Sequence, residues 1–236
     1  MLTSLYTVKS DSVITYDRAV ARWAPGARGR LQEAAFELYG EKGFEQTTVG
    51  EIAARAGVTE RTFYRYFADK REVFFDGSRA LTDFLVAAVA EGPAGADPLE
   101  MVLAALCRAG RELFAERRAL ARRRQALVEA NPELYERELA KMAGLTASLS
   151  GALRARGVAE PAARLASETG IGIFRTAFAR WVEPAEPAGA SGAPDAPDAP
   201  GLDAVIVAVF GELSNLVGRA GAAGLLQAAM GGGGRR

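Results

Sequence analysis

The sequence predicts an all-α protein with about nine helices in total. Apolar residues recur at spacings of three and four over most of the chain, which is the period of amphipathic helices. Prolines or N-capping residues precede these runs, and glycines follow several of them. Strand-like patterning is confined to one short patch at Val13, Ile14 and Thr15, so no sheet is expected.

The first helix is expected to run from Pro25 to Gly43. Proline suits the first turn of a helix, and glycine suits the residue that ends one. Between them, the apolar side chains follow the three-four spacing and therefore share one face of the helix. This face consists of Leu31, Ala34, Ala35, Leu38 and Tyr39.

Two short helices follow, separated by a turn that contains Gly57. Thr48 and Glu51 have the spacing of a capping box, which predicts the start of the first short helix. Thr59 is expected to cap the second, which runs from Glu60 to Phe67. Two short helices joined in this way form a helix-turn-helix unit, whose second helix can enter the major groove of DNA.

The outward face of the second short helix carries groups that suit DNA. Phe63 and Phe67 are four residues apart and are expected to point inward. Arginine can donate two hydrogen bonds to guanine, and threonine offers a hydroxyl and a methyl group to thymine. Asp69 is expected to cap the next helix, and Lys70 in the first turn of that helix is a candidate phosphate ligand. The outward residues are Thr59, Arg61, Thr62, Arg65 and Tyr66.

The tract from Thr48 to Phe74, TVGEIAARAGVTERTFYRYFADKREVF, resembles the DNA-binding domain of tetracycline-repressor (TetR) family regulators. The resemblance covers Arg28 to about Phe75, because the preceding helix also fits. It implies a three-helix DNA-binding domain followed by a helical domain that binds a ligand and dimerises. Carried over by position, the family's phosphate contacts fall on Thr48, Tyr64, Tyr66 and Lys70, and its base-reading positions fall on Thr59, Glu60, Arg61 and Thr62.

Some of these positions have a second interpretation. Gly50 stands where some family members have a longer base-contacting side chain, so sequence selection is expected to depend more on Arg61 and Arg65. Arg65 is either a DNA contact or a solvated side chain. Tyr64 is either a phosphate ligand or a packing residue with a hydrated hydroxyl. Arg28 belongs to an N-terminal group with Arg18, Arg22 and Arg30, which either follows a minor groove or is part of a loose tail.

The larger domain is expected to span residues 73–222, after a DNA-binding domain at 25–72. A connecting helix is predicted from Lys70 to Glu91. Further helix starts are indicated at Pro98, Pro132, Pro161 and Leu202. Three segments are expected to be loosely structured because they are short of apolar residues or rich in Pro, Ala, Gly and Asp. They are the arm at 1–24, the loop at 184–201 and the tail at 223–236.

A subset of the apolar residues in the larger domain is predicted to line a ligand pocket. The spacing of Arg111, Arg118 and Arg122 places them on one helix face, which is either solvated beside glutamates such as Glu112, Glu116 and Glu129 or an anion-binding wall. This region also resembles, more weakly, the acyl-CoA-responsive actinobacterial members of the family. The predicted pocket residues are Leu106, Cys107, Phe114, Arg118, Arg122, Leu145, Phe174 and Phe178.

The last two helices are expected to form a dimer. They run from Pro161 to Val182 and from Asp203 to Val217, and both are apolar over a broad arc. Two such helices from each subunit can pack about a two-fold axis. A two-fold dimer places two recognition helices on the DNA and predicts a palindromic operator.

Composition restricts the function. The chain has no histidine and one cysteine, which argues against histidine-dependent catalysis, metal sites and cofactor chemistry. No apolar run is long enough for a membrane span, and a cytoplasmic location is expected. The charge is balanced, with Lys+Arg 29 and Asp+Glu 29, so binding to DNA away from an operator is expected to be weak.

The leading hypothesis is therefore a dimeric transcriptional repressor that a small-molecule effector, acyl-CoA-like or other, releases from its DNA operator. The alternatives are a helical interaction protein without DNA binding and a transcriptional activator of the same fold. An enzyme is disfavoured because neither a Gly-rich phosphate loop nor a paired acidic motif is present.

Overall fold

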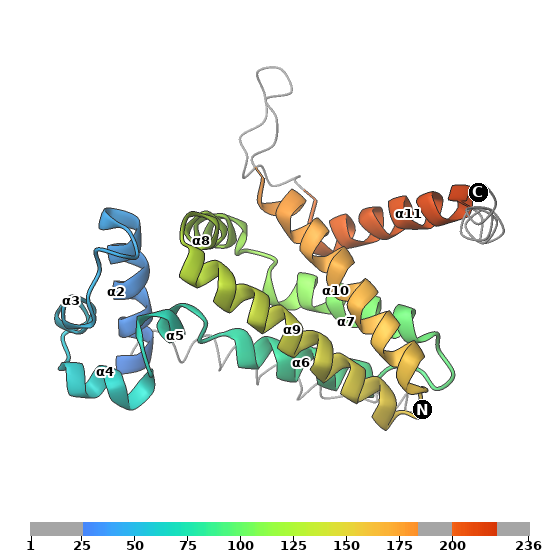
Figure 1. The fold of residues 1–236 in the computed structure, drawn as a ribbon, viewed down its shortest axis with the longest axis horizontal. Coiled ribbons are helices and arrows are strands. Elements are labelled where there is room, and N and C mark those ends of the chain that lie inside the picture. The colour runs from blue at the N-terminus through green and yellow to red at the C-terminus, as the bar shows by residue number, and fades with distance from the viewer. Residues whose placement is uncertain (1–25, 184–199, 221–236) are drawn as a thin grey trace, which may run out of the picture. The chain divides into compact units, whose positions relative to one another are not determined.

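The computed structural model describes residues 26–183 and 200–220, and it is all-helical over these residues, with ten helices and no strand (Figure 1). The chain divides into two compact units between Asp76 and Gly77. The predicted all-α fold with an N-terminal helix-turn-helix unit is confirmed. The arm at 1–24, the tail at 223–236 and residues 184–199 of the predicted loop lie outside the described residues.

Residues 26–76 of the first unit form four helices, α2 (Ala27–Lys42), α3 (Val49–Arg55), α4 (Glu60–Tyr66) and α5 (Lys70–Phe74). Helix α2 packs against each of the other three. The expected apolar face of α2 is buried in full, with Leu31 and Ala35 inaccessible to solvent. The largest buried side chains of this core are Tyr39, Phe44, Ile52 and Phe63.

The ends of α3 and α4 follow from their capping residues. The Thr48 hydroxyl accepts a hydrogen bond from the backbone N–H of Glu51, whose carboxylate accepts the N–H of Thr48 in return. The turn between the helices contains Gly57 at φ 66°, a left-handed conformation that glycine adopts without strain. The predicted capping box and turn are therefore confirmed.

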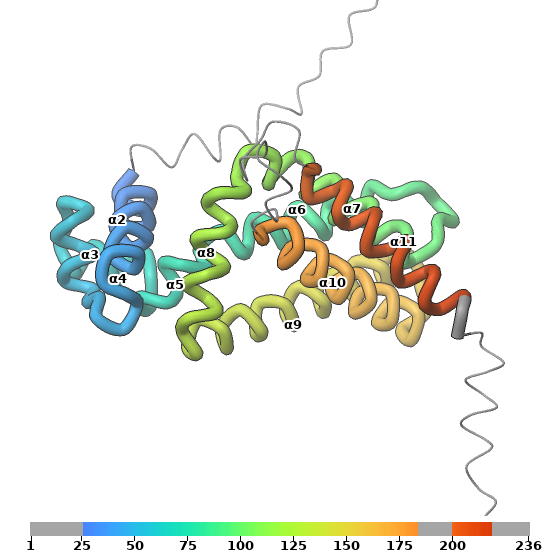
Figure 2. Tube along the Cα trace, turned by 90° about the horizontal axis from the view of Figure 1, so that it is seen from above, coloured from blue at the N-terminus to red at the C-terminus, as the bar shows by residue number. Residues whose placement is uncertain are grey.

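The described residues of the second unit form six helices, whose arrangement can be followed in Figure 2. Helix α10 lies at its centre, against α7, α8, α9 and α11, while α6 packs on α7 and α9. Leu106, Leu149 and Ala177 are among the buried side chains that fill the space between them. The helices are α6 (Ser78–Ala90), α7 (Pro98–Leu113), α8 (Arg118–Ala130), α9 (Pro132–Ala155), α10 (Glu160–Val182) and α11 (Leu202–Ala220).

The predicted connecting helix from Lys70 to Glu91 is wrong in one respect, because the chain forms two helices there. Helix α5 ends at Phe74, and α6 starts at Ser78. In the intervening turn, Phe75 is buried in the aromatic cluster of the first unit, and the Asp76 carboxylate pairs with Arg28. These contacts favour the turn over a continuous helix and account for the tenth helix.

The start of α11 lies unusually close to α7. A methyl group placed on Gly110 would lie 2.9 Å from the backbone nitrogen of Asp203, which is closer than carbon atoms approach such groups. Two neighbouring side chains of α7 reach the same residue. Arg111 is 3.5 Å from the Asp203 carboxylate, and the Cys107 thiol is 3.8 Å from the Asp203 carbonyl oxygen. The absence of a side chain at position 110 thus permits this packing.

Replacing Gly110 with alanine is expected to destabilise the protein, since backbone atoms of α11 must move to admit the methyl group. Overpacking of this kind costs about 1–3 kcal/mol. Gly144→Ala on α9 is the matched control, because nothing lies within 4 Å of its methyl position. That change is expected to raise the free energy of unfolding by about 0.5–1 kcal/mol, because alanine has a higher helix propensity than glycine. Urea unfolding of both variants measures the difference, and equal midpoints would contradict the close approach.

Candidate nucleic-acid interface

Helix α4 presents its polar side chains to solvent while its aromatic side chains close the core beneath it. Phe63 is fully buried and Phe67 is 4% exposed. The Thr59 hydroxyl caps the helix by accepting the N–H of Thr62 at 3.2 Å, and the two threonine hydroxyls lie 3.1 Å apart. The predicted inward and outward faces of this helix are therefore confirmed.

The exposed aromatic residues of α4 have different surroundings. Tyr64 is 56% exposed, and the edge of its ring meets Phe63 at 5.4 Å between ring centroids. Tyr66 is 37% exposed and lies beneath the guanidinium of Arg65, which is 4.9 Å from the ring centroid and donates to the tyrosine hydroxyl. Both tyrosine hydroxyls lie at the surface, as a phosphate contact requires.

Outside α4, several arginine and lysine side chains of the first unit pair with a carboxylate. Arg55 of α3 pairs with Glu37 and Glu41 of α2, and Lys42 pairs with Glu51. The Lys42 ammonium, with two hydrogen bonds from Thr48, lowers the pKa of the Glu51 carboxyl to about 2. By contrast, Arg61 and Arg65 meet no carboxylate within the described part of the chain. The uncompensated arginines thus lie on the predicted recognition helix.

Arg28, a predicted DNA contact, is engaged within the unit. Its guanidinium donates to the Asp76 carboxylate, with Nε 2.8 Å from one oxygen, and lies 5.6 Å from the centroid of the Phe67 ring. The hydrogen bond to Asp76 raises the pKa of Arg28. About half of the side chain remains exposed. Arg28 therefore joins the start of α2 to the turn after α5.

Lys70, a predicted phosphate ligand, points into the unit. Its ammonium lies 2.9 Å from the carbonyl oxygen of Phe44, 3.3 Å from that of Thr47 and 3.4 Å from that of Glu45. It also lies 4.2 Å from the centroid of the Phe44 ring. An ammonium group has three donors, and these three carbonyls can use all of them. Lys70 therefore supports the loop between α2 and α3.

The remaining predicted contacts are Thr48 and Glu60. The Thr48 hydroxyl is exposed but is committed to its capping role, at 2.8 Å from a carboxylate oxygen of Glu51. Glu60, the first residue of α4, is exposed and lies directly against Gly50 of α3. The contact between Glu60 and Gly50 was not expected from the sequence, because no local pattern relates two residues on different helices.

The predicted pocket residues of the second unit lie in three settings. Leu106, Leu145 and Phe174 are buried in the core. Phe114 and Phe178 form an aromatic cluster with Phe174 and Trp181, in which ring centroids are 5.8 to 6.4 Å apart. Cys107 is half-buried beside Asp203, and burial raises the pKa of its thiol.

The expectation that Arg111, Arg118 and Arg122 share one helix face is wrong. Arg111 lies on α7 and the other two on α8, because the chain leaves the helix where Phe114 turns into the aromatic cluster. Arg118 and Arg122 instead donate from Nε to the carbonyl oxygens of Trp181 and Val182, at 2.6 and 2.7 Å. These contacts satisfy the last carbonyls of α10, which have no partner within the helix.

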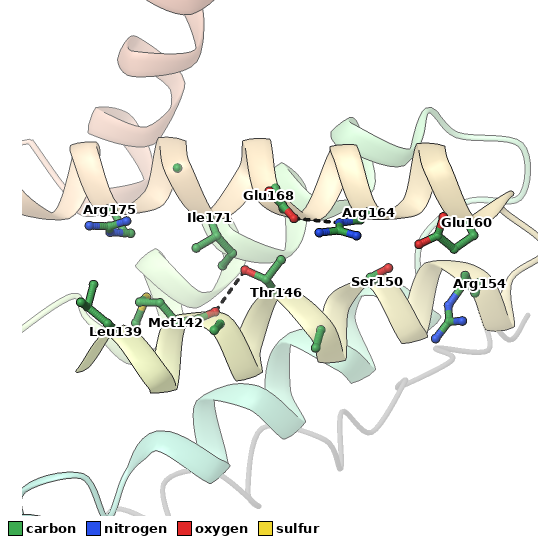
Figure 3. Close-up of a pocket in the computed structure, with 13 residues that line it drawn as sticks. Leu139, Met142, Thr146, Ser150, Arg154, Glu160, Arg164, Glu168, Ile171 and Arg175 are labelled. Carbon is green, nitrogen blue, oxygen red and sulfur yellow. Dashed lines mark hydrogen bonds and ion pairs between the residues drawn. The ribbon is translucent and has the colours of Figure 1, made fainter. Parts of the chain in front are cut away.

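An open groove of about 620 Å³ lies between the antiparallel helices α9 and α10 (Figure 3). Leu139, Met142 and Ile171 form its apolar part. Figure 3 places Arg175 at one end and Arg154 at the other, while Arg164 between them pairs with Glu168 at 3.0 Å. None of the predicted pocket residues lines this groove.

A family model described as "Bacterial regulatory proteins, tetR family" matches residues 31–76, the helix-turn-helix unit and its supporting helices. The match assigns residues 31–76 to the tetR family. The tetR-family match covers α2 to α5 and ends at the boundary between the two compact units. It therefore includes every predicted DNA contact except Arg28.

Named relatives match about a third of the chain. The HTH-type transcriptional regulator TcmR of Streptomyces glaucescens is 41% identical over 73 residues, which are 31% of this chain and 32% of that protein. The HTH-type transcriptional repressor KstR2 of Mycobacterium tuberculosis is 37% identical over 68 residues, 29% of this chain and 34% of that protein. The chain thus spans about a third of the length of these relatives.

Among solved structures, similarity extends over more of the chain at lower identity. The regulator FadR of Bacillus subtilis, solved in complex with stearoyl-CoA, is 22% identical with a TM-score of 0.49, covering 77% of this chain and 94% of that chain. NalD of Pseudomonas aeruginosa, the secondary repressor of an efflux pump, is 22% identical with a TM-score of 0.48, covering 78% and 94%.

Replacing Lys70 with methionine tests whether its ammonium group supports the fold, apart from any contact with phosphate. The carbonyls of Phe44 and Thr47 would lose a partly buried donor, so a loss of about 1–3 kcal/mol in the free energy of unfolding is expected. Arg61→Ala is the control and is expected to change stability by less than about 0.5 kcal/mol, because its side chain is exposed. Thermal unfolding measures both. An unchanged melting temperature for Lys70→Met would show that the ammonium is not needed by the fold.

Proposed function

We propose that this protein is a transcriptional regulator that binds operator DNA through α4, and that it acts as a repressor. One observation carries the proposal. In a DNA-binding unit whose other ionised side chains are largely paired with one another, Arg61 and Arg65 are exposed on α4 without a carboxylate partner. Unpaired arginines on a short helix supported from below by aromatic residues suit insertion into a major groove.

The alternative of a helical interaction protein without DNA binding is less well supported. A helix that docks on a protein groove usually presents apolar anchors at its exposed positions. The exposed residues of α4 are instead arginine, glutamate and tyrosine, and Thr62 is half-buried. An enzyme is also disfavoured, because the relatives that match are named as regulators.

We also propose that the protein is a homodimer that uses α10 and α11. Helix α11 exposes Val207, Leu216 and Val217, each more than 60% accessible, and α10 exposes Leu165 at 69%. Exposed apolar side chains concentrated on neighbouring helices are typical of an association surface. A two-fold arrangement of these helices would predict a palindromic operator. Among residues 26–183 and 200–220, no helix combines the length and the apolar character that a membrane span requires. Separately, we propose a cytoplasmic location, because operator DNA is found in the cytoplasm.

A small molecule is proposed to release the DNA, and an acyl-CoA-like compound remains the candidate effector. This part of the proposal is based on the weaker sequence resemblance of the second domain. Arg118 and Arg122, which the sequence suggested as part of an anion site, are only partly available for such a site. The Nε atom of each donates a hydrogen bond to the end of α10. An anion at this site would have to contact the other nitrogens of these side chains.

DNA binding is tested with operators selected from random DNA by the full-length protein, followed by anisotropy titrations at several salt concentrations. Arg61→Ala is expected to weaken binding to the selected operator by about tenfold to 100-fold and to relax selection at one position of each half-site, because a bidentate arginine–guanine pair contributes about 1–3 kcal/mol. Binding to unrelated DNA is expected to change little. Addition of a long-chain acyl-CoA to the complex is expected to lower the anisotropy.

Each part of this proposal has its own contradicting result. Failure to enrich any sequence would contradict operator binding. Equal weakening on operator and unrelated DNA would assign Arg61 to the phosphate backbone. A complex that is unaffected by both acyl-CoA and free coenzyme A would remove the acyl-CoA hypothesis while leaving DNA binding intact.

A further inference from the structure

The side chain of Glu60 occupies the space that any side chain at position 50 would need. A methyl group placed on Gly50 would lie 2.7 Å from Oε1 of Glu60 and 3.6 Å from its carboxylate carbon. The third nearest atom is the Thr48 hydroxyl oxygen at 3.9 Å. The Glu60 carboxylate therefore rests on the first turn of α3, and it can do so only because residue 50 is a glycine.

This arrangement follows from the way in which the two helices start. Gly50 is the second residue of α3, and Glu60 is the first residue of α4. Thr59 caps α4 and so fixes the direction in which the Glu60 side chain leaves the backbone. The capping box does the same for the first turn of α3. Both elements are set by local hydrogen bonds, and the carboxylate lies at their junction.

The carboxylate is an acceptor on the surface that the proposed function assigns to DNA. Glu60 is exposed and adjoins Arg61 in sequence. In the major groove, a carboxylate accepts a hydrogen bond from the amino group of cytosine and is repelled by the acceptor atoms of guanine. It also repels phosphates and so weakens binding that is independent of sequence. The position of this group thus affects both base selection and non-specific affinity.

We propose that Gly50 is a specificity-determining residue that acts through Glu60, by letting the carboxylate lie against α3 at the place where it selects cytosine. This inference depends on the proposed function, because it concerns the same DNA-reading surface. Gly50 itself contacts no base. A side chain at position 50 moves the carboxylate and changes the base that is selected.

A substitution at position 50 is well tolerated by the fold, which makes the proposal testable. The atoms that obstruct a methyl group belong to the far end of an exposed, flexible side chain rather than to backbone. Gly50 also has no positive φ angle, so alanine fits its backbone conformation. Gly50→Ala is therefore expected to fold with an unchanged or higher melting temperature. A clearly lower melting temperature would mean that the carboxylate cannot yield, and this would overturn the proposal.

The experiment is a double-mutant cycle on the full-length protein with Gly50→Ala, Glu60→Ala and the double variant. Operators are first selected by the wild-type protein, and affinity is then measured for all four bases at each half-site position. The wild type is expected to prefer cytosine over guanine at one position by about tenfold or more. Glu60→Ala is expected to abolish this preference and to tighten binding to unrelated DNA severalfold. Gly50→Ala is expected to reduce or redirect the preference severalfold.

The decisive comparison is the effect of Gly50→Ala when Glu60 is already alanine. The proposal predicts no further change in base preference in the double variant. A change of the same size with and without Glu60 would show that position 50 acts directly, and no change in either background would show that it does not select bases. Both results overturn the inference but leave operator binding intact. If the wild type selects no operator at all, the proposed function fails and the inference fails with it.

Discussion

The proposed DNA-reading surface depends on the anchoring of a helix that is too short to be stable by itself. Helix α4 has seven residues, whereas isolated helices shorter than about 12–15 residues are marginal in water. It is held by the buried rings of Phe63 and Phe67 and by the Thr59 cap. Because these contacts fix the rotation and the start of the helix, they also fix where its outward side chains project. Loss of Phe63 would therefore remove the whole surface rather than one contact.

Electrostatic compensation decides which of these outward side chains remain available. The neutral charge of the chain at first argues against a nucleic-acid ligand, which usually needs a basic surface. In the first unit the carboxylates are used locally. Arg28, Lys42 and Arg55 each have a carboxylate partner, while Arg61 and Arg65 have none among the described residues. In the proposed function, neutrality limits binding that is independent of sequence, and these two arginines, which lack a carboxylate partner, provide the selective part.

The local features of the fold could be predicted from the sequence, because they depend on residues close together in the chain. The capping box at Thr48 and Glu51, the Gly57 turn and the inward pair Phe63 and Phe67 are of this kind. The features that could not be predicted are contacts over long sequence separations. Periodicity alone could not show that Phe75 and Asp76 would end the connecting helix.

The candidate site shows the same division. The sequence indicated which side chains of α4 face outward, but it could not show that the Lys70 ammonium turns towards the carbonyls of Phe44 and Thr47, which lie more than 20 residues away. Likewise, Arg118 and Arg122 bind the end of α10 at separations of 63 and 60 residues. A charged residue can be identified in a sequence, whereas its partner depends on the packing of whole helices.

The most direct test of the central claim, that a dimer reads DNA through α4, is a hydroxyl-radical footprint of the full-length protein on its selected operator. The account predicts two protected half-sites related by a two-fold axis, with centres about one or more helical turns apart. It also predicts that Arg61→Ala loses both half-sites together. A single protected site, or protection that is unchanged in Arg61→Ala, would contradict the account.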